Sequence, residues 1–343
     1  MAKLDVSLFF RRLKGFSLKR MTTYLDDVKK ETKLPKFLIL LDMLYCIPAY
    51  HVGFFDYHIF GFIHIPKAKD RRTFFTMNDN WKLCRMVNSP DTIHYFQNKL
   101  DFTEAFRDYL GREVLNLEKN EAGALYPFLQ KHPVVFIKNP DSFGGLQVRR
   151  YEVPADLTEA AAADLYKEWK ENGFLLVEEA ITQHPEMSRL YPDSVNTIRI
   201  VTLLDPEGKP HVLYHFIRTG RGGAHIDNTT SGGLSTLVCE DGIIRKPALS
   251  DKTGLYHNDH PDTGVSFIGF KVPYFAEAIE LCKKAARVLP GMGYVGWDVA
   301  ITPNGPVLVE GNDLPAYDGQ IYHQQEHPGH GLKPLVQSIR PDF

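Results

Sequence analysis

Two pairs of apolar segments in the second half of the chain restrict its fold more than any other feature, because each pair is joined by a short turn sequence. Residues 197–204 and 211–218 are connected by Asp-Pro-Glu-Gly, and residues 296–302 and 306–310 by Pro-Asn-Gly. Turns of this composition reverse the chain, so each pair is predicted to form antiparallel strands. We therefore expect a long antiparallel element in this half of the chain.

The rest of the chain mixes shorter strand and helix patterns. Residues 134–138 (VVFIK) and 174–178 (FLLVE) are predicted to be buried strands. Helices are predicted over 79–117, over the alanine-rich segment 156–172 and over 274–289. This mixture indicates an α/β or α+β fold, and 343 residues suffice for two or three lobes.

The N-terminal part, residues 1–75 or so, is predicted to be helical. Its longest apolar run, 37–50, contains Asp42 and Pro48 and is shorter than the roughly 20 residues that span a bilayer, so we expect a buried helix. The first 20 residues carry six basic residues against one acidic residue. They form either a terminal helix packed on the protein itself or a basic amphipathic helix on an anionic membrane or an acidic partner.

The composition excludes several classes of protein. A formal net charge of −2 argues against a nucleic-acid partner. Four cysteines without a CxxC pair argue against a zinc module and a disulfide framework, and they fit a reducing compartment. Because no signal-peptide pattern opens the chain, we expect a cytoplasmic protein.

Asp298 and Glu310 flank the last turn and are candidate metal ligands. With a three-residue loop at 303–305, the two carboxylates face each other, and Asn312 lies on the same face because strand side chains alternate. Opposed carboxylates repel each other unless a cation lies between them, and carboxylate and amide oxygens suit Mg²⁺. The alternative is a surface hairpin shifted by one residue, in which the acids point apart.

A candidate phosphate site follows the strand predicted at 134–138. Lys138 ends this strand and runs into a loop with Ser142, Gly144 and Gly145. Backbone N–H groups of such a loop can point at anionic oxygens, and the ammonium adds positive charge. A solvated turn has the same composition, so this pattern alone leaves both interpretations open.

Two arginines and a glycine-rich stretch add further candidates. Arg199 and Arg218 lie inside apolar strands, where a guanidinium requires an anionic partner, either a bound phosphate or carboxylate or an internal acid. The stretch 220–233 contains too many glycines for a simple turn. We expect it to cover phosphates or admit substrate, with Asn228 as its candidate functional residue.

Acidic residues follow the second buried strand. Glu178 and the backbone of Glu179 and Ile181 are candidates for contacts with an adenine edge, and Glu186 is a candidate for ribose hydroxyls. The alternative is a pair of exposed acids at a strand end.

Three histidines near the C-terminus have the spacing of metal ligands on a helix. They are His323, His327 and His330, but Pro328 and Gly329 interrupt such a helix. We therefore interpret them as loop histidines.

The order of these features is more specific than any one of them. Lys99, Lys138 with its glycine loop, the acidic strand end, the arginine strands and the carboxylate hairpin resemble the ATP-grasp superfamily in order and spacing. The chain is most similar to its sugar-transfer-associated group, through the stretches SVNTIRIVTLL, DNTTSGG, GWDVAIT and VLVEGND. The resemblance covers roughly residues 95–335.

The resemblance implies the ATP-grasp fold, in which two α+β lobes grip ATP. The expected division is a helical N-terminal region at 1–95, a small lobe at 96–180 and a large lobe with the metal site at 181–343. The implied cofactors are ATP and Mg²⁺, with two ions. The implied contacts are Lys99 and Lys138 with the phosphates, Glu178, Glu179 and Ile181 with adenine, Glu186 with ribose, Arg199 and Arg218 with the transferred phosphate, and Asp298, Glu310 and Asn312 with magnesium.

The reaction implied by the resemblance is ligation. The γ-phosphate passes to a carboxylate, and an amine then attacks the acyl-phosphate to form an amide. The sugar-polymer association of this group implies an amino acid joined to a sugar acid or glycan precursor. The alternatives are a kinase that phosphorylates a hydroxyl and a non-catalytic protein that binds nucleotide or glycan.

Overall fold

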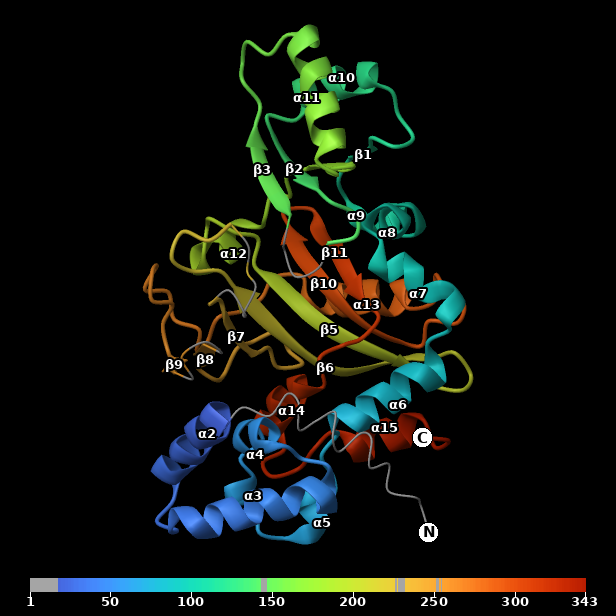
Figure 1. The fold of residues 1–343 in the computed structure, drawn as a ribbon. Coiled ribbons are helices and arrows are strands. Elements are labelled where there is room, and N and C mark those ends of the chain that lie inside the picture. Colours follow the sequence, from blue (N-terminus) through green and yellow to red (C-terminus); the bar gives the residue numbers. More distant parts are fainter. Residues whose placement is uncertain (1–17, 143–146, 226, 228–231, 251–252, 254) are drawn as a thin grey trace.

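The structure is a computed structural model that describes residues 18–142, 147–225, 227, 232–250, 253 and 255–343. It begins with a helical layer at one end of the molecule (Figure 1). The elements of this layer are α2 (Leu18–Glu31), α3 (Lys36–Tyr50), α4 (Phe54–Ile59), η1 (Phe62–His64) and α5 (Ala68–Arg71). They share a core of their own that includes Ile39, Met43 and Phe62.

Four further helices connect this layer to the sheets: α6 (Met77–Val87), α7 (Pro90–Gln97), α8 (Lys99–Ala105) and α9 (Arg107–Leu110). Side-chain caps explain where three of them begin. Thr76 forms a capping box with Asp79 at α6, and Ser89 and Asn98 accept hydrogen bonds from the first backbone N–H groups of α7 and α8.

A small four-stranded sheet stands above these helices in Figure 1. Its strands are β1 (Val114–Asn116), β2 (Val134–Lys138), β3 (Val148–Glu152) and β4 (Leu176–Glu179), in the order β1-β4-β2-β3 with antiparallel neighbours. The helices α10 (Leu125–Lys131), which follows the short turn η2 (Ala122–Ala124), and α11 (Glu159–Glu171) bury their apolar side chains against it. This sheet has its own core.

A large seven-stranded sheet forms the centre of the molecule, with the order β11-β10-β5-β6-β7-β8-β9 and antiparallel neighbours throughout. Its strands are β5 (Thr197–Leu204), β6 (Pro210–Thr219), β7 (Leu234–Leu237), β8 (Ala248–Ser250), β9 (Tyr256–His257), β10 (Tyr294–Thr302) and β11 (Gly305–Asn312). The expected long antiparallel element is therefore confirmed.

Helices cover both faces of the large sheet. The apolar side of α13 (Phe275–Ala285) packs on one face, next to Phe96 and Phe106, whose rings contact Trp297. The other face carries α6 and α15 (Lys333–Ile339), and α14 (Gln320–Glu326) packs on β6 and β7. The short helix α12 (Pro185–Leu190) precedes β5, and η4 (Tyr317–Gly319) precedes α14. Both faces are buried, which explains the nearly continuous apolar runs of β5 and β10.

Several predicted strands are present, and two helix predictions are wrong in part. The strands predicted at 134–138 and 197–204 match β2 and β5. The helical prediction for 79–117 is wrong at its end, where β1 pairs with β4; a strand of three residues is too short to show an alternating pattern. Residues 37–50 are helical as expected, but the prediction that this helix is buried is wrong, because one side of α3 is exposed.

The expected domain limits can be compared with the element positions. The limit between 95 and 96 falls inside α7, and α7, α8 and α9 all contact β11 of the large sheet. The small sheet begins only at Val114. The limit between 180 and 181 directly follows β4. Within the described residues, no helix is both long enough and apolar enough to cross a membrane.

Candidate active site

A cavity of about 400 Å³ opens where the small sheet meets the β10–β11 end of the large sheet. Its walls come from α8, from both sheets and from the segments that follow β4 and β6. The charged and polar residues that line it are Lys99, Lys138, Glu178, Glu179, Thr197, Arg199, Arg218, His225, Asp227, Asp298, Glu310 and Asn312. Sequence segments as far apart as Lys99 and Asn312 therefore contribute to one charged site.

The β10–β11 hairpin presents two carboxylates to this cavity. Asp298 lies opposite Glu310, as expected, but the strand register that brings them together differs from the predicted one. Thr302 pairs with Gly305, so the loop has two residues instead of three, and an irregularity between Asp298 and Val299 restores the pairing. A β-bulge of this kind re-aims the side chains that follow it.

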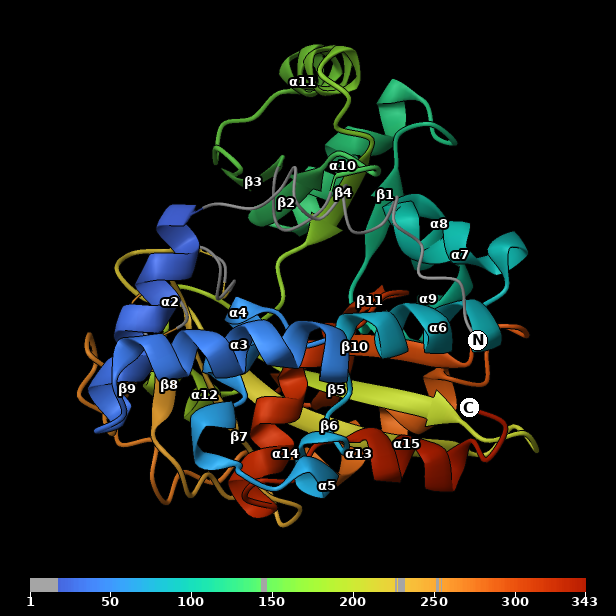
Figure 2. The ribbon, with the colours of Figure 1, turned by 60° about the horizontal axis from the view of Figure 1, so that its bottom comes forward.

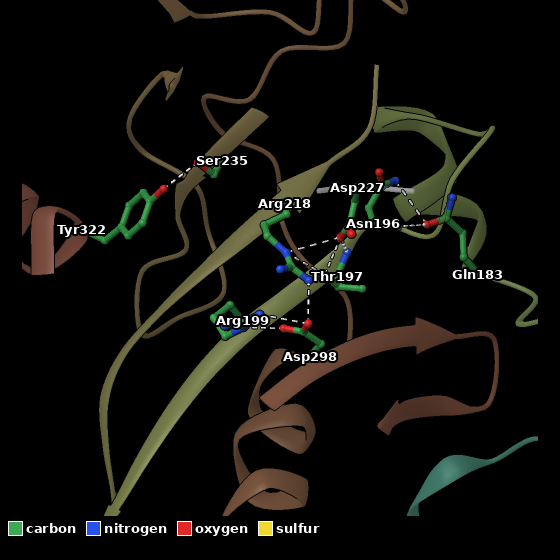
Figure 3. A network of polar contacts seen from close by, with 9 residues as sticks. All are labelled: Gln183, Asn196, Thr197, Arg199, Arg218, Asp227, Ser235, Asp298 and Tyr322. Atoms are coloured by element: carbon green, nitrogen blue, oxygen red, sulfur yellow. Dashed lines mark hydrogen bonds and ion pairs between the residues drawn. The ribbon is translucent and has the colours of Figure 1, made fainter. Parts of the chain in front are cut away.

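Asp298 is buried and held by two arginines (Figure 3). The Nη2 atoms of Arg199 and Arg218 lie 3.0 and 2.9 Å from its Oδ2, and Arg199 Nε donates to Oδ1. Arg199 is the direct neighbour of Asp298 in the β5–β10 register. Although burial opposes ionisation, the two guanidinium groups hold the pKa of Asp298 below its ordinary value. Arg199 and Arg218 thus have the anionic partner that their apolar strands require.

Glu310 lies opposite Asp298 on the neighbouring strand and faces the cavity. Its deep position and the adjacent Asp298 carboxylate raise the pKa of Glu310 above its ordinary value. The side chain is nevertheless accessible, because the cavity opens next to it. Asn312 follows on the same strand, and its Nδ2 lies 3.4 Å from the carbonyl oxygen of Gly296, which leaves the side-chain oxygen available to a ligand.

These three side chains fit a divalent cation. Asp298 and Glu310 lie opposite each other on neighbouring strands, and a cation between two such carboxylates would offset their repulsion. Two carboxylates and an amide oxygen form a donor set that Mg²⁺ accepts, with phosphate oxygens in other positions. Residues 298, 310 and 312 could therefore hold Mg²⁺, and Asp298 would share its oxygens between the metal and the two arginines.

Two lysines lie on the opposite side of the cavity. Lys99, at the start of α8, reaches the loop after β2, where its Nζ lies 3.3 Å from Ser142 Oγ and 3.4 Å from the Asn139 carbonyl oxygen and also contacts the Ser142 carbonyl oxygen. Its burial lowers the pKa of Lys99. Lys138 ends β2 and forms an ion pair with Glu178 on the neighbouring strand β4. The lysine side chains are thus held in place before any anion binds.

Glu178 has a further partner that the sequence analysis missed. Arg112 Nη2 lies 3.1 Å from Glu178 Oε1, and the same guanidinium donates to the carbonyl oxygens of Leu308 and Val309 on β11, at 2.7 and 3.2 Å. Burial opposes ionisation of Glu178, but Arg112 and Lys138 hold its pKa at about 2. The side chain of Glu178 therefore lies in an ion-pair network with Arg112 and Lys138.

A second missed residue is Asp227, in the glycine-rich stretch. Its Oδ2 accepts hydrogen bonds from the Thr197 backbone N–H, at 2.8 Å, and from the Thr197 hydroxyl. Arg218 Nη2 donates to the same hydroxyl at 2.7 Å, and Arg218 Nε lies 3.6 Å from Asp227. Figure 3 shows this chain of contacts running from Asp298 to Asp227. The sequence signal that could have indicated Asp227 was its position directly before Asn228, which the sequence analysis named as a candidate functional residue.

The segment between β4 and β5 is anchored by two amides, also seen in Figure 3. Gln183 Oε1 accepts from the Asn196 backbone N–H at 3.0 Å, and its Nε2 donates to the carbonyl oxygens of Tyr191 and Ser194. Asn196 Nδ2 donates to Met187 and Tyr191 carbonyl oxygens. This network holds the chain just after Ile181, where it forms one wall of the cavity.

Most of the predicted site residues that the structure describes meet at this cavity. Lys99, Lys138, Glu178, Glu179, Ile181, Arg199, Arg218, Asp298, Glu310 and Asn312 line it, and Ser142 lines a smaller adjoining space with Lys99 and Lys138. Glu186 does not: it lies on α12, paired with Arg189, beside a different surface groove. Gly144, Gly145 and Asn228 lie outside the described residues.

The sequence analysis predicted that all three C-terminal histidines lie in a loop, and this prediction is wrong in part. His323 lies within α14, and His327 ends this helix. Their rings lie 4.4 Å apart, and burial lowers the pKa of His323 to about 4. Among the described residues, no group of three or more His, Cys, Asp or Glu side chains is arranged to hold a metal.

Comparison with known proteins adds a family and a set of distant structures. A profile of the family described as sugar-transfer associated ATP-grasp matches residues 143–340. No curated protein matches the sequence. D-alanyl-alanine synthetase A from Vibrio cholerae O1 biovar eltor str. N16961 matches at a TM-score of 0.42 and 15% identity, over 74% of this chain and 66% of that chain. N5-carboxyaminoimidazole synthetase from Staphylococcus aureus, complexed with ADP, matches at 0.42 and 10%, over 72% and 53%. This chain thus spans less than two thirds of the length of either structure.

Proposed function

Because this chain belongs to the sugar-transfer-associated ATP-grasp family, we propose that its cavity binds ATP with Mg²⁺ and that the protein is an ATP-dependent ligase. One observation supports this assignment most: two lysines, two arginines and three oxygen ligands from separate parts of the chain meet in one cavity. Lys138, Arg199 and Arg218 are already paired with Glu178 and Asp298, so a polyphosphate would bind together with the metal that the oxygen ligands suit.

The apolar part of the cavity suits the adenine ring. Phe136, Val148, Ile181, Val195 and Val309 line it from both sheets and from the segments after β4. A flat heteroaromatic ring between such side chains is shielded from water, and backbone groups at 179–181 would contact its polar edge. The adenine contact proposed here therefore involves the backbone rather than the Glu178 carboxylate.

The charged part suits phosphoryl transfer. Such a reaction depends on positioning and on neutralising charge more than on covalent chemistry by the protein. Lys99 and Lys138 would hold the phosphates near the nucleoside, and Arg199 and Arg218 would hold the transferred phosphoryl group. Magnesium bound by residues 298, 310 and 312, in two ions by family resemblance, would neutralise charge on the β- and γ-phosphates.

The proposed reaction joins a carboxylate to an amine. A carboxylate oxygen takes the γ-phosphoryl group and ADP leaves; the amine nitrogen then attacks the acyl carbon, phosphate leaves, and an amide forms. We extend the substrate class to an amino acid and a sugar acid or glycan precursor because of the family association alone. Free, buried cysteines agree with a reducing compartment such as the cytoplasm.

Product analysis tests this function. The protein is incubated with Mg²⁺, ATP and pooled amino acids and uronic acids, and ADP and free phosphate are measured together. Equal amounts of both, dependent on both pools and absent in a folded Glu310→Ala variant, are expected. ADP without free phosphate would indicate a kinase, and no turnover with any pool would favour a non-catalytic binding protein.

A further inference from the structure

Helix α3 has an apolar side that faces water. After Lys36, its exposed residues are all apolar or aromatic: Phe37, Leu38, Leu41, Leu44, Tyr45, Pro48 and Ala49. Phe37, Leu41 and Tyr45 keep 63%, 59% and 59% of their surface exposed. Residues 37, 41, 44, 45 and 48 lie on one face at helical spacing. We call this face the α3 apolar surface.

The only acid of α3 points the other way. Asp42 forms a bidentate ion pair with Arg71, with both N–O distances at 2.7 Å, and accepts a hydrogen bond from Tyr57 at 2.6 Å. The inward face is completed by the buried side chains of Ile39, Met43 and Cys46. An ordinary surface helix shows its charges to water. The reversed arrangement in α3 indicates that the outward face is covered by something apolar.

Positive charge lies at the N-terminal end of this surface. Residues 18–36 contain six basic and three acidic residues, a net charge of +3. Lys33 and Lys36 are exposed where the chain enters α3, next to the exposed Leu34. Lys36 pairs with Asp26, but both side chains are more than half exposed, and such a pair leaves most of the long-range attraction to anions in place.

We propose that the α3 apolar surface and the basic residues beside it dock this protein on the surface of an anionic lipid bilayer. Apolar side chains would enter the interface, and lysines at its edge would meet lipid phosphates. With 15 residues, α3 is too short to span the bilayer, so it lies in the interface plane.

The charge distribution favours a bilayer over a second protein copy. A symmetric dimer through this surface would bring two copies of the segment 18–36, each of net charge +3, close together, and like charges oppose such association. The same argument opposes cover by residues 1–17, which are themselves basic. An anionic bilayer complements both the charge and the apolar side chains.

The position of α3 is compatible with activity at the membrane. Figure 1 places α3 at the end of the molecule opposite the small sheet, and Figure 2 shows it running across the front when that end is turned forward. The proposed ATP cavity lies between the two sheets. A docked protein would therefore keep this cavity open to water.

Vesicle flotation tests this inference with the full chain. Phosphatidylcholine vesicles with and without phosphatidylserine are mixed with the wild type, with Phe37→Glu and Leu41→Glu, and with the matched control Ile268→Glu, which changes an exposed apolar residue outside α3. We expect the wild type and the control to float with anionic vesicles only. Each α3 variant should float about tenfold less, because it loses apolar contact and gains negative charge.

Several outcomes would overturn the inference. The first is a wild type that floats with neither kind of vesicle. The second is a set of α3 variants that float as well as the wild type, which would assign the binding to residues 1–17. The third is a concentration-dependent dimer of the wild type that Phe37→Glu dissociates. Normal urea unfolding of the α3 variants excludes loss of fold as the cause. ATP turnover is measured in parallel, so that failure of docking and failure of the proposed ligase are distinguished.

Discussion

At the residue scale, Arg112 illustrates how one side chain can hold two sheets together. Its guanidinium joins Glu178 of the small sheet to the backbone of β11 in the large sheet, and both charged side chains are almost fully buried. A buried carboxylate that loses a cationic partner keeps its desolvation cost. The geometry of the cavity wall between these sheets therefore depends on Arg112.

Replacing Arg112 by alanine should destabilise the protein by about 3 kcal/mol, because Glu178 would keep only Lys138 as its partner and two β11 carbonyl groups would lose their donor. The measurement is urea unfolding. The control is Arg107→Ala on α9, an exposed arginine whose removal should have little effect. Equal stability of the two variants would contradict a structural role for the Arg112 ion pair.

Sequence reasoning found the charged residues that lie in recognisable strands and missed those that do not. Arg199 and Arg218 stood out because they interrupt apolar strands. Arg112 precedes a three-residue strand, and its partners are 66 and about 200 residues away, so no local pattern marks it. Asp227 lies in a glycine-rich stretch whose conformation the sequence alone does not determine.

At the element scale, the β10–β11 hairpin shows a correct pairing reached through an incorrect loop. The Pro-Asn-Gly turn and strand alternation predicted that Asp298 faces Glu310, and it does. The loop is one residue shorter than expected, and the bulge after Asp298 compensates. Bulges depend on tertiary packing around the hairpin rather than on alternation, so their position is not readable from the sequence.

The Asp42–Arg71 ion pair connects α3 to α5 and makes the free energy of unfolding of the protein depend on pH. Burial opposes ionisation of Asp42, but hydrogen bonds from Arg71 and Tyr57 lower its pKa. Because the folded pKa is below the unfolded value, the stabilisation is present above the unfolded value of 3.8 and is lost as the pH falls through the folded value.

The Asp42→Asn variant should therefore be less stable than the wild type by about 1–2 kcal/mol at pH 7, and the difference should shrink as the pH falls from about 5 to 2. Urea unfolding across this range measures it. The control is Asp27→Asn, which removes an exposed pair with Lys30. A wild-type advantage that persists unchanged at the lowest pH would contradict this assignment.

At the scale of the whole molecule, the sequence predicted a mixed fold with a helical start and an antiparallel second half. It did not predict how the small sheet stands on the large one. That arrangement depends on contacts such as Arg112 with β11 and on the packing of α7–α9 against the large sheet. The cavity exists only because of this arrangement, so most of its residues, though not Asp227, were predictable one by one, whereas their meeting was visible only in the fold.

The central claim is that this cavity binds ATP together with Mg²⁺. Calorimetric titration of ATP, with and without Mg²⁺, tests it directly on the wild type, on Glu310→Gln and on the exposed control Glu280→Gln. The wild type and the control should bind ATP about tenfold or more tightly with Mg²⁺, and Glu310→Gln should lose this gain. No ATP binding by the wild type, or a full Mg²⁺ effect in Glu310→Gln, would contradict the account.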